Sequence, residues 1–253
     1  MKKNLSYIEI NSKMWDVWAS EGGDWSIPIS HEDFIKATQG IFEIYLTPCK
    51  PVPKDWFIPL DGAKVLGLAS GGGQQCPVFA AQNAKVTVFD NSDKQLEMEQ
   101  MVSEREGYTI EIIKGDMSKQ LPFEDDTFDM IFHPVSNCYV EDVEHVWRES
   151  FRVLKKGGVL LSGFTNPALY LFGEGEEELK VVDKLPYNGM ESSSKNVDEL
   201  IVASGVQFSH SLETQIGGQL KAGFQLKELY EDKHHKGILT EYMPCYIATK
   251  SVK

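Results

Sequence analysis

The chain has 253 residues, 42% of them hydrophobic, with a mean hydropathy of −0.29, which suffices for one large domain with a substantial core. Its net charge of −13 argues against a nucleic-acid backbone or an anionic membrane surface as partner. The four cysteines lack the spacing of a zinc site or a disulfide framework, so we expect reduced thiols and no metal. We find neither a signal peptide nor a membrane span, and therefore expect a cytoplasmic protein.

Residues 1–60 are predicted to form a helical appendage that acts as a lid. Trp15 and Trp18 share one helical face, which indicates either a helix docked on the core or a flap closing over a cationic or aromatic ligand. No clear period precedes this helix over the first 11 residues. Ser30, followed by Asp33, predicts the start of a second helix that carries apolar residues as far as Leu46. Four prolines between 47 and 59 then interrupt regular structure.

Strands and helices alternate from residue 61 onward. The pattern predicts strands at 64–68, 85–89, 110–114, 128–132 and 159–162. It predicts helices between the first two strands, at 93–106 and at 143–154, the last ended by residues 155–157. This alternation is typical of a doubly wound α/β fold, a mostly parallel sheet with helices on both faces. Residues 61–165 are thereby predicted to form the ligand-binding half.

The alternation stops between residues 166 and 211, which we interpret as an insertion capping the strand ends. A helix at 212–222 and strands at 224–230 and 242–249 then predict an antiparallel close of a seven-stranded sheet. Residues 212–253 would therefore complete the same domain. His234 and His235 fall in the loop between these strands, where we interpret them as solvated residues and not as metal ligands.

A glycine turn and an acidic residue frame the predicted ligand site. The first strand runs into Gly71–Gly73, where backbone can approach a ligand closely, and the second strand ends in Asp90. This layout is typical of a nucleotide-binding βαβ unit, with the acid on ribose hydroxyls. Cys76 stands where the dinucleotide fingerprint has its third glycine, and no phosphate-binding P-loop follows. A ligand without a pyrophosphate fits better, with a nicotinamide-dependent oxidoreductase as the alternative.

Five segments, in order, resemble the class I S-adenosylmethionine-dependent methyltransferases that act on small molecules. These segments are residues 65–73, Asp90, and residues 115–117, 121–132 and 148–158. The resemblance extends over residues 64–164, with a weaker match over residues 212–249. It implies S-adenosylmethionine as cofactor, with Asp90 on the ribose, Asp116 accepting from the adenine amine, and Met117 against the ring. The implied cofactor contacts are Ala69, Ser70, Gly71, Gly73, Gln75, Asp90, Asn91, Asp116, Met117 and His133.

The first motif departs from that family at two positions. Gly67 replaces the usual acid, and Ala69 replaces a usual glycine. Loss of the acid removes an organiser of the glycine loop, for which Gln74 or Gln75 could compensate. A non-catalytic binding module that kept the fold is therefore a second alternative. If the missing acid weakens binding, restoring Asp at position 67 is expected to raise cofactor affinity.

Methyl transfer to a small organic acceptor, at oxygen, nitrogen, sulfur or carbon, is an in-line displacement that requires alignment and sometimes a base. The acceptor is expected beyond the strand ends, near the 133–139 loop. His133 could be the base, or a structural histidine that shapes the cofactor wall. We expect no nucleic acid, no membrane, and a monomer or homodimer. The candidate acceptor contacts are Trp15, Trp18, Asn137, Tyr139, Tyr170 and His210.

Overall fold

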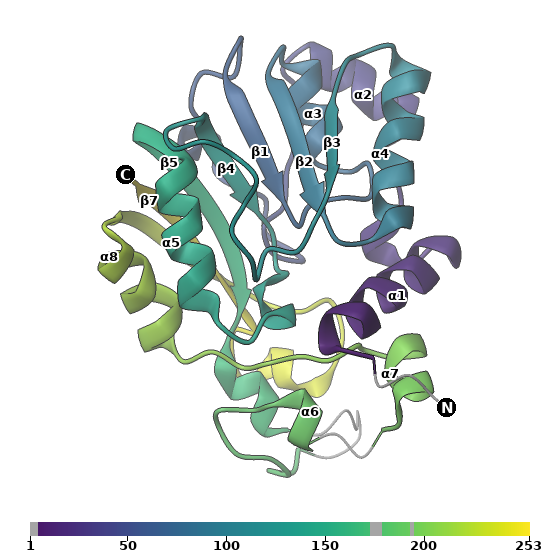
Figure 1. Cartoon of the computed structure of the whole chain (residues 1–253), viewed down its shortest axis with the longest axis vertical. Coiled ribbons are helices and arrows are strands. Elements are labelled where there is room, and N and C mark those ends of the chain that lie inside the picture. The colour runs from purple at the N-terminus through teal and green to yellow at the C-terminus, as the bar shows by residue number, and fades with distance from the viewer. Residues whose placement is uncertain (1–4, 173–178, 193–194) are drawn as a thin grey trace.

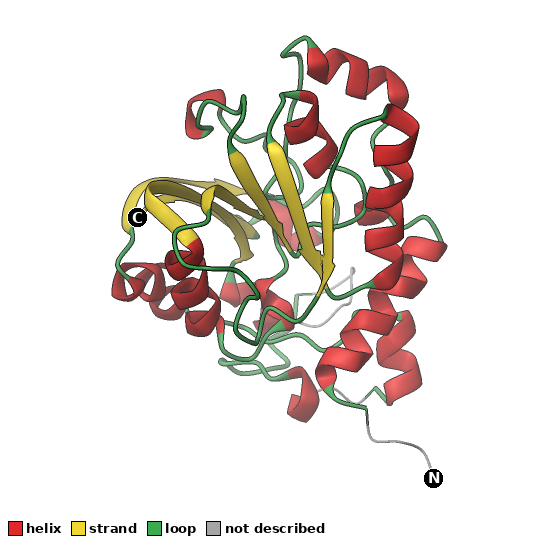
Figure 2. Ribbon diagram, turned by 45° about the horizontal axis from the view of Figure 1, so that its top comes forward, coloured by secondary structure: helices red, strands yellow, loops and turns green. Residues whose placement is uncertain are grey.

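The computed structural model describes residues 5–172, 179–192 and 195–253 and is built on a seven-stranded sheet with helices on both faces (Figures 1 and 2). The spatial order of the strands is β3-β2-β1-β4-β5-β7-β6. Strands β1 to β5 are parallel, and β7 is antiparallel to both of its neighbours, which confirms the doubly wound fold with an antiparallel close. The strand bounds are β1 Lys64–Leu68, β2 Lys85–Asp90, β3 Glu111–Lys114, β4 Phe128–His133, β5 Leu154–Thr165, β6 Gln225–Asp232 and β7 Tyr246–Val252.

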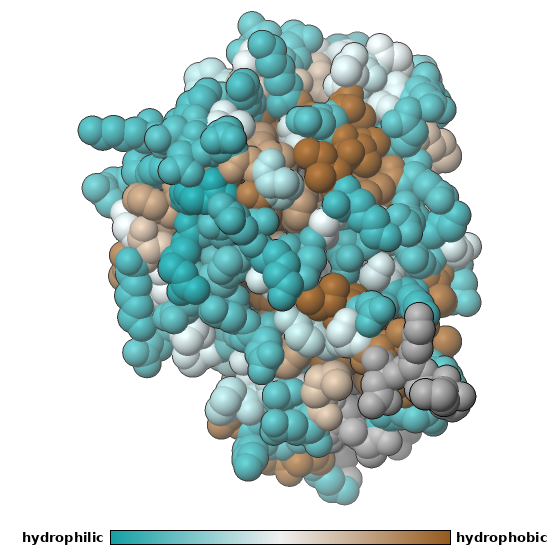
Figure 3. Space-filling view, viewed as in Figure 1, coloured by the Kyte–Doolittle hydropathy of each residue, from teal (hydrophilic) through white to brown (hydrophobic). Residues whose placement is uncertain are grey.

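Consecutive residues of the central strands point to opposite faces, so each face of the sheet buries its own core. Val65 packs with Phe79 on one face, and Leu66 packs with Trp147 on the other. None of the described helices is long and apolar enough to span a membrane. Figure 3 shows a mostly hydrophilic face with separate hydrophobic patches. The helices are α1 Tyr7–Ser20, α2 His31–Thr38, α3 Cys76–Ala81, α4 Asp93–Glu106, α5 Val143–Val153, α6 Gly189–Ser192, α7 Val197–Val202 and α8 Gly218–Ala222, the last preceded by a π-helical turn, Glu213–Gly217.

The N-terminal helices differ from the prediction at their ends. Helix α1 begins at Tyr7, where Ser6 and Glu9 form a capping box, and so starts within the first 11 residues, where the sequence showed no clear period. The polar Asn11 interrupts the apolar pattern of this helix, although it is buried. Its side-chain amide donates to the backbone oxygen of Val206 and accepts from the Val206 N–H. Helix α2 ends at Thr38 and not near residue 46, because Gly40 adopts a left-handed φ of 78°.

Strand β5 is longer than predicted and begins directly after α5, at Leu154. Residues 155–157, expected to end the helix, belong to this strand, whose pairing with β4 is irregular between Phe128 and Met130. At the other end of the chain, the last strand begins at Tyr246 and not at 242. The sequence pattern predicted where the strands lie, but it did not predict the residues at which these two strands begin.

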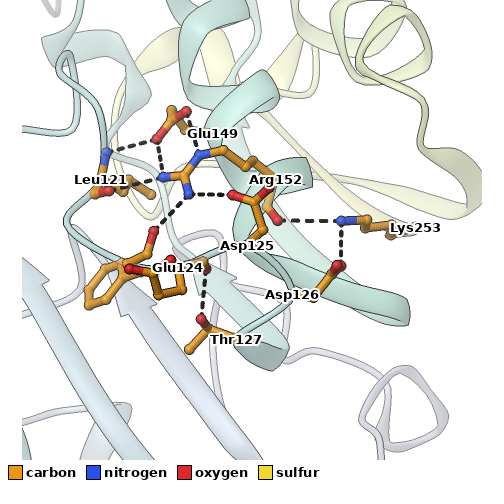
Figure 4. Close-up of polar contacts among 9 residues, drawn as sticks. Leu121, Glu124, Asp125, Asp126, Thr127, Glu149, Arg152 and Lys253 are labelled. Carbon is orange, nitrogen blue, oxygen red and sulfur yellow. Dashed lines mark hydrogen bonds and ion pairs between the residues drawn. The ribbon is translucent and has the colours of Figure 1, made fainter.

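Arg152 of α5 is hydrogen-bonded to the loop that leads into β4 (Figure 4). Its guanidinium donates to the backbone oxygens of Leu121 and Phe123, at 2.9 and 2.7 Å, and pairs with Glu149 at 2.7 Å. Glu149 in turn accepts from the Leu121 N–H at 2.8 Å. These contacts join the segments 121–132 and 148–158 and so fix the chain that follows Asp116.

Helices α1 and α7 lie together beyond the carboxyl ends of β1 to β3 (Figure 1). Their contact is apolar, through Ile10 of α1 and Leu200 of α7, with Val206 and Phe208 beside them. The segment predicted as an insertion contains α6 and α7; its residues 173–178 and 193–194 lie outside the described part of the chain. This end of the molecule covers the edge of the sheet where the predicted site falls.

Candidate functional site

A cavity of about 390 Å³ lies at the carboxyl ends of the central strands. Its wall is formed by the loops after β1, β2, β3 and β4, by α1, and by the segments around residues 45–48 and 234–246. Ligands of open α/β sheets bind at this edge, where the strand order reverses. The predicted cofactor residues that line this cavity are Ala69, Ser70, Gly71, Gln75, Asp90, Asn91, Asp116 and Met117.

The glycine loop is held from beneath by three hydrogen bonds. The N–H of Gly71 donates to Asp90 Oδ2 at 3.0 Å, and the N–H of Gly72 donates to the backbone oxygen of Gln95 at 3.0 Å. The N–H of Gly73 donates to Glu99 Oε1 at 2.7 Å. Gly73 therefore faces α4 and does not line the cavity, in contrast to its predicted cofactor contact.

Ala69 adopts a left-handed φ of 49°. This region favours glycine because a Cβ crowds the backbone there, so the site carries local strain at the turn out of β1. The N–H of Ala69 donates to the Phe89 oxygen at 2.8 Å, which holds the turn against β2.

Asp90 joins the glycine loop to the turn that opens α4. Its Oδ1 accepts from the Ser92 N–H at 3.0 Å while Oδ2 accepts from Gly71, and burial raises the pKa of Asp90 despite these bonds. The adjacent Asn91 is tied to α1, because its backbone oxygen accepts from Ser12 at 2.8 Å. The acid predicted to take ribose hydroxyls is thus coupled to the helix that covers the cavity.

The cavity wall fits a nucleoside with a cationic end. Among its residues, Ser70 Oγ and Gln95 Oε1 are buried and have no hydrogen-bond partner in the described chain. Asp90 and Asp116 supply carboxylates, whereas no lysine or arginine occurs among the described residues that line the cavity. This charge balance suits a sulfonium and does not suit a pyrophosphate.

His133 lies behind the cavity wall and not on it. Its side chain is fully buried, Nδ1–H donates to the Leu68 oxygen at 2.8 Å, and Nε2 has no partner in the described chain. Burial lowers the pKa of His133 to about 4, so the ring is neutral at pH 7. This position supports the structural role and neither the cofactor contact nor the base that the sequence suggested.

Three of the six candidate acceptor residues line the cavity: Trp15, Trp18 and Tyr139. The ring of Trp15 meets Trp18 edge-on at 5.4 Å and Tyr139 at 5.7 Å, which gives this side of the cavity a continuous aromatic surface.

The other three, Asn137, Tyr170 and His210, do not line the cavity. Asn137 exchanges two 3.1 Å hydrogen bonds with Gln215, and the Tyr170 hydroxyl bonds to Gln207 at 2.9 Å. His210 Nε2–H donates to the Asn137 and Val140 oxygens at 3.1 and 3.0 Å. The bonds of Asn137 and His210 hold the loop after β4, because buried polar groups must find partners.

Five aromatic residues to which the sequence analysis gave no role in the site also line the cavity: Trp25, Tyr45, Phe89, His234 and Tyr246. The ring of His234, interpreted above as solvated, stacks on Tyr246 at 5.9 Å, and its Nδ1 lies 3.0 Å from the Lys236 oxygen. The pairing of β6 with β7 brings this loop to the cavity, and no local signal in the sequence reveals it.

Glu99 gives the stability of the protein an unusual pH dependence. Burial, with a contribution from Asp90, raises the pKa of Glu99 from 4.5 to about 8, so the folded chain keeps a proton that the unfolded chain releases above pH 4.5. Wild-type stability is therefore expected to fall by about 1.4 kcal/mol per pH unit, relative to Glu99→Gln, between those values. The nearby Cys76 and Tyr108 have raised pKa values and remain protonated there.

Urea unfolding of wild type and Glu99→Gln at several pH values measures this difference. A difference that stays constant from pH 5 to pH 8 would show that Glu99 is already ionised in the folded protein.

The chain is similar to known methyltransferases in both sequence and fold. A family model described as "Methyltransferase domain" matches residues 66–162. The chain is 46% identical over 248 residues to "Uncharacterized methyltransferase YbaJ" of Bacillus subtilis (strain 168), covering 96% of this chain and 97% of that protein. It is 36% identical over 102 residues to the sterol 24-C-methyltransferase erg6 of Aspergillus fumigatus, covering 39% and 27%. A solved S-adenosylmethionine-dependent methyltransferase from Mesorhizobium loti has the same fold, with a TM-score of 0.63 at 19% identity over 79% of this chain and 95% of that one.

Proposed function

Because this chain belongs to the class I S-adenosylmethionine-dependent methyltransferases and uses S-adenosylmethionine as methyl donor, we propose that its acceptor is a small, neutral and largely apolar molecule. A nicotinamide-dependent oxidoreductase is not favoured, since no lysine or arginine among the described residues lining the cavity could pair with a pyrophosphate. The acceptor atom, whether oxygen, nitrogen, sulfur or carbon, is left open by this proposal.

The aromatic wall carries the proposal. We use this name for Trp15, Trp18, Trp25, Tyr139 and Tyr246, which line the cavity together with the cofactor residues. An anionic acceptor would be desolvated there beside two carboxylates without a compensating cation in the described lining, whereas apolar and aromatic groups pack well. The partial similarity to a sterol 24-C-methyltransferase supports an apolar acceptor.

Different residues of the cavity would have different roles in methyl transfer. The bound cofactor supplies an electrophilic methyl group on a sulfonium. Asp90, Asp116 and Met117, which line the cavity, would hold its nucleoside. The aromatic wall excludes water and aligns the acceptor, and such alignment is the main contribution an enzyme makes to an in-line displacement.

An acceptor that loses a proton requires a base, for which we propose His234. Its Nδ1 lies 3.0 Å from the Lys236 oxygen and 3.1 Å from the Lys236 nitrogen, so both tautomers find a partner there. The base is the tautomer in which Nδ1–H donates to the oxygen, because Nε2 is then free to accept that proton. Cys138 and Tyr246 also line the cavity, but both keep their own protons at neutral pH and so cannot accept another group's, because burial raises the pKa of both, that of Cys138 to about 12.

A matched set of acceptors tests the proposal. Isothermal titration of the protein saturated with S-adenosylhomocysteine would compare 2-naphthol and menadiol with 2-naphthoate, and transfer of a tritiated methyl group would identify the compounds that react. We expect the neutral compounds to bind at least about 10-fold more tightly than the carboxylate, which corresponds to roughly 1.4 kcal/mol. A preference for the carboxylate would contradict the proposal.

Replacing Trp15 by alanine should raise the KM for the best acceptor of that set by about 10- to 100-fold, since a large aromatic contact is lost. The affinity for S-adenosylhomocysteine, measured by titration, should change by less than about 3-fold, roughly 0.7 kcal/mol. Lys13→Ala lies on the same helix but is exposed and outside the cavity lining, so it serves as control and should change neither quantity. An unchanged KM in Trp15→Ala would remove the aromatic wall from the acceptor site.

A further inference from the structure

Glu99 is a carboxyl group buried directly beneath the cofactor loop. Its side chain has no exposed surface; Oε1 accepts from the Gly73 N–H at 2.7 Å, and Oε2 has no partner in the described chain. Its neighbours on the buried side of α4 include Leu96 and Val102. A buried carboxyl with one unsatisfied oxygen is costly, so packing alone would favour an apolar residue at this position.

Position 67, at the end of β1, has no room for a side chain that could support the glycine loop. A Cβ built on Gly67 would lie 2.4 Å from Cys76 Sγ, and Cys76 is fully buried against the turn, with Sγ 3.6 Å from the Ser70 oxygen. Cys76 therefore fills the space into which a side chain at position 67 would point. An acid that supports the glycine loop must come from another element.

We propose that Glu99 is the positioning residue for the cofactor loop, supporting Gly73 from α4. Gly73 transmits this support, because its oxygen accepts from the Ile29 N–H at 2.8 Å and so joins the loop to the segment after Trp25. Gln74, the next residue, donates to the Ile27 oxygen at 2.9 Å. Fixing Gly73 therefore fixes both Gln75 and the N-terminal side of the cavity, although Glu99 does not itself line it.

The support depends on an acceptor atom and not on a charge. A protonated carboxyl group still accepts through its carbonyl oxygen, and the amide oxygen of glutamine has the same place and geometry. Glutamine should therefore replace Glu99 in this role, and an apolar side chain of similar size should not. The inference concerns the cofactor alone and stands independently of the proposed acceptor.

Titration with S-adenosylhomocysteine at pH 7 tests the role, with hydrogen exchange of the Gly73 amide as a second readout. We expect Glu99→Leu to bind at least about 10-fold more weakly and to lose protection at Gly73, because the N–H is left unpaired. Glu99→Gln should stay within about 3-fold of wild type and keep that protection. Val102→Ala is the matched control: Val102 faces the same glycine from the same helix, so its loss should lower Tm without a comparable loss of affinity.

Three results would overturn the role of Glu99: wild-type affinity in Glu99→Leu, an equal loss in Glu99→Gln, or an equal loss in Val102→Ala. If Glu99→Leu does not fold, Glu99→Met replaces it, and lost protection of Gly73 in Glu99→Gln still overturns the proposal. Failure of the wild-type protein to bind S-adenosylhomocysteine would instead contradict the cofactor, so the two failures are distinguishable.

Discussion

Asp90→Ala should weaken binding of S-adenosylhomocysteine by about 10- to 150-fold, or roughly 1.5–3 kcal/mol, the range for hydrogen bonds to a charged group. The carboxylate lies in the cavity wall and accepts from the N–H groups of Gly71 and Ser92. Its removal would take away the proposed acceptor for the ribose hydroxyls and leave two backbone donors without a partner. Isothermal titration of the purified variant measures the loss.

Asp93→Ala is the matched control for this variant. Asp93 opens α4 three residues further on, is exposed, and pairs with Lys114 at 2.6 Å, outside the cavity lining. Removing this surface pair should leave cofactor affinity within about 3-fold of wild type, since exposed ion pairs contribute little. Equal losses in the two variants would indicate a general effect of negative charge, and wild-type affinity in Asp90→Ala would exclude Asp90 from the cofactor site.

The cofactor half of the cavity could be predicted from the sequence because it depends on local patterns. Gly71, Asp90 and Asp116 each follow a short apolar run, and parallel strands bring their carboxyl ends to one edge of the sheet. The alternation of elements predicts a parallel sheet, so these residues are expected at the same edge without knowledge of any side-chain contact. The cavity contains all three.

The acceptor half could not be predicted in the same way, because long-range pairing assembles it. His234 and Tyr246 reach the cavity through the antiparallel pairing of β6 with β7, and Trp25 reaches it through a segment held by the glycine loop. Conversely, the topology predicted that His133 and Asn137 lie near the strand ends, but it could not predict the direction of their side chains. Both side chains turn inward and bond to buried partners. A loop can be located from its sequence neighbours, whereas the orientation of its side chains depends on the whole fold.

Gly67 shows how packing reverses an expectation drawn from the sequence. Restoring an acid there was expected to raise cofactor affinity, yet a Cβ at this position would lie 2.4 Å from Cys76 Sγ and 3.5 Å from Ser70 Cβ. Gly67→Asp is therefore expected to lower the free energy of unfolding by about 3 kcal/mol or more, combining overpacking with a buried carboxylate that has no cation nearby. Affinity for S-adenosylhomocysteine should fall as well, because the displaced turn carries Ala69 and Ser70.

Two further variants separate the steric from the electrostatic part of this loss. Gly67→Ala adds the Cβ without a charge and should cost about 1–3 kcal/mol in urea unfolding. Combining Gly67→Asp with Cys76→Gly removes the thiol that blocks the new side chain, so the double variant should be more stable than the sum of the two single changes predicts. Additive losses would mean that Cys76 does not close this position. Wild-type stability together with tighter cofactor binding in Gly67→Asp would contradict the steric explanation and restore the expectation drawn from the sequence.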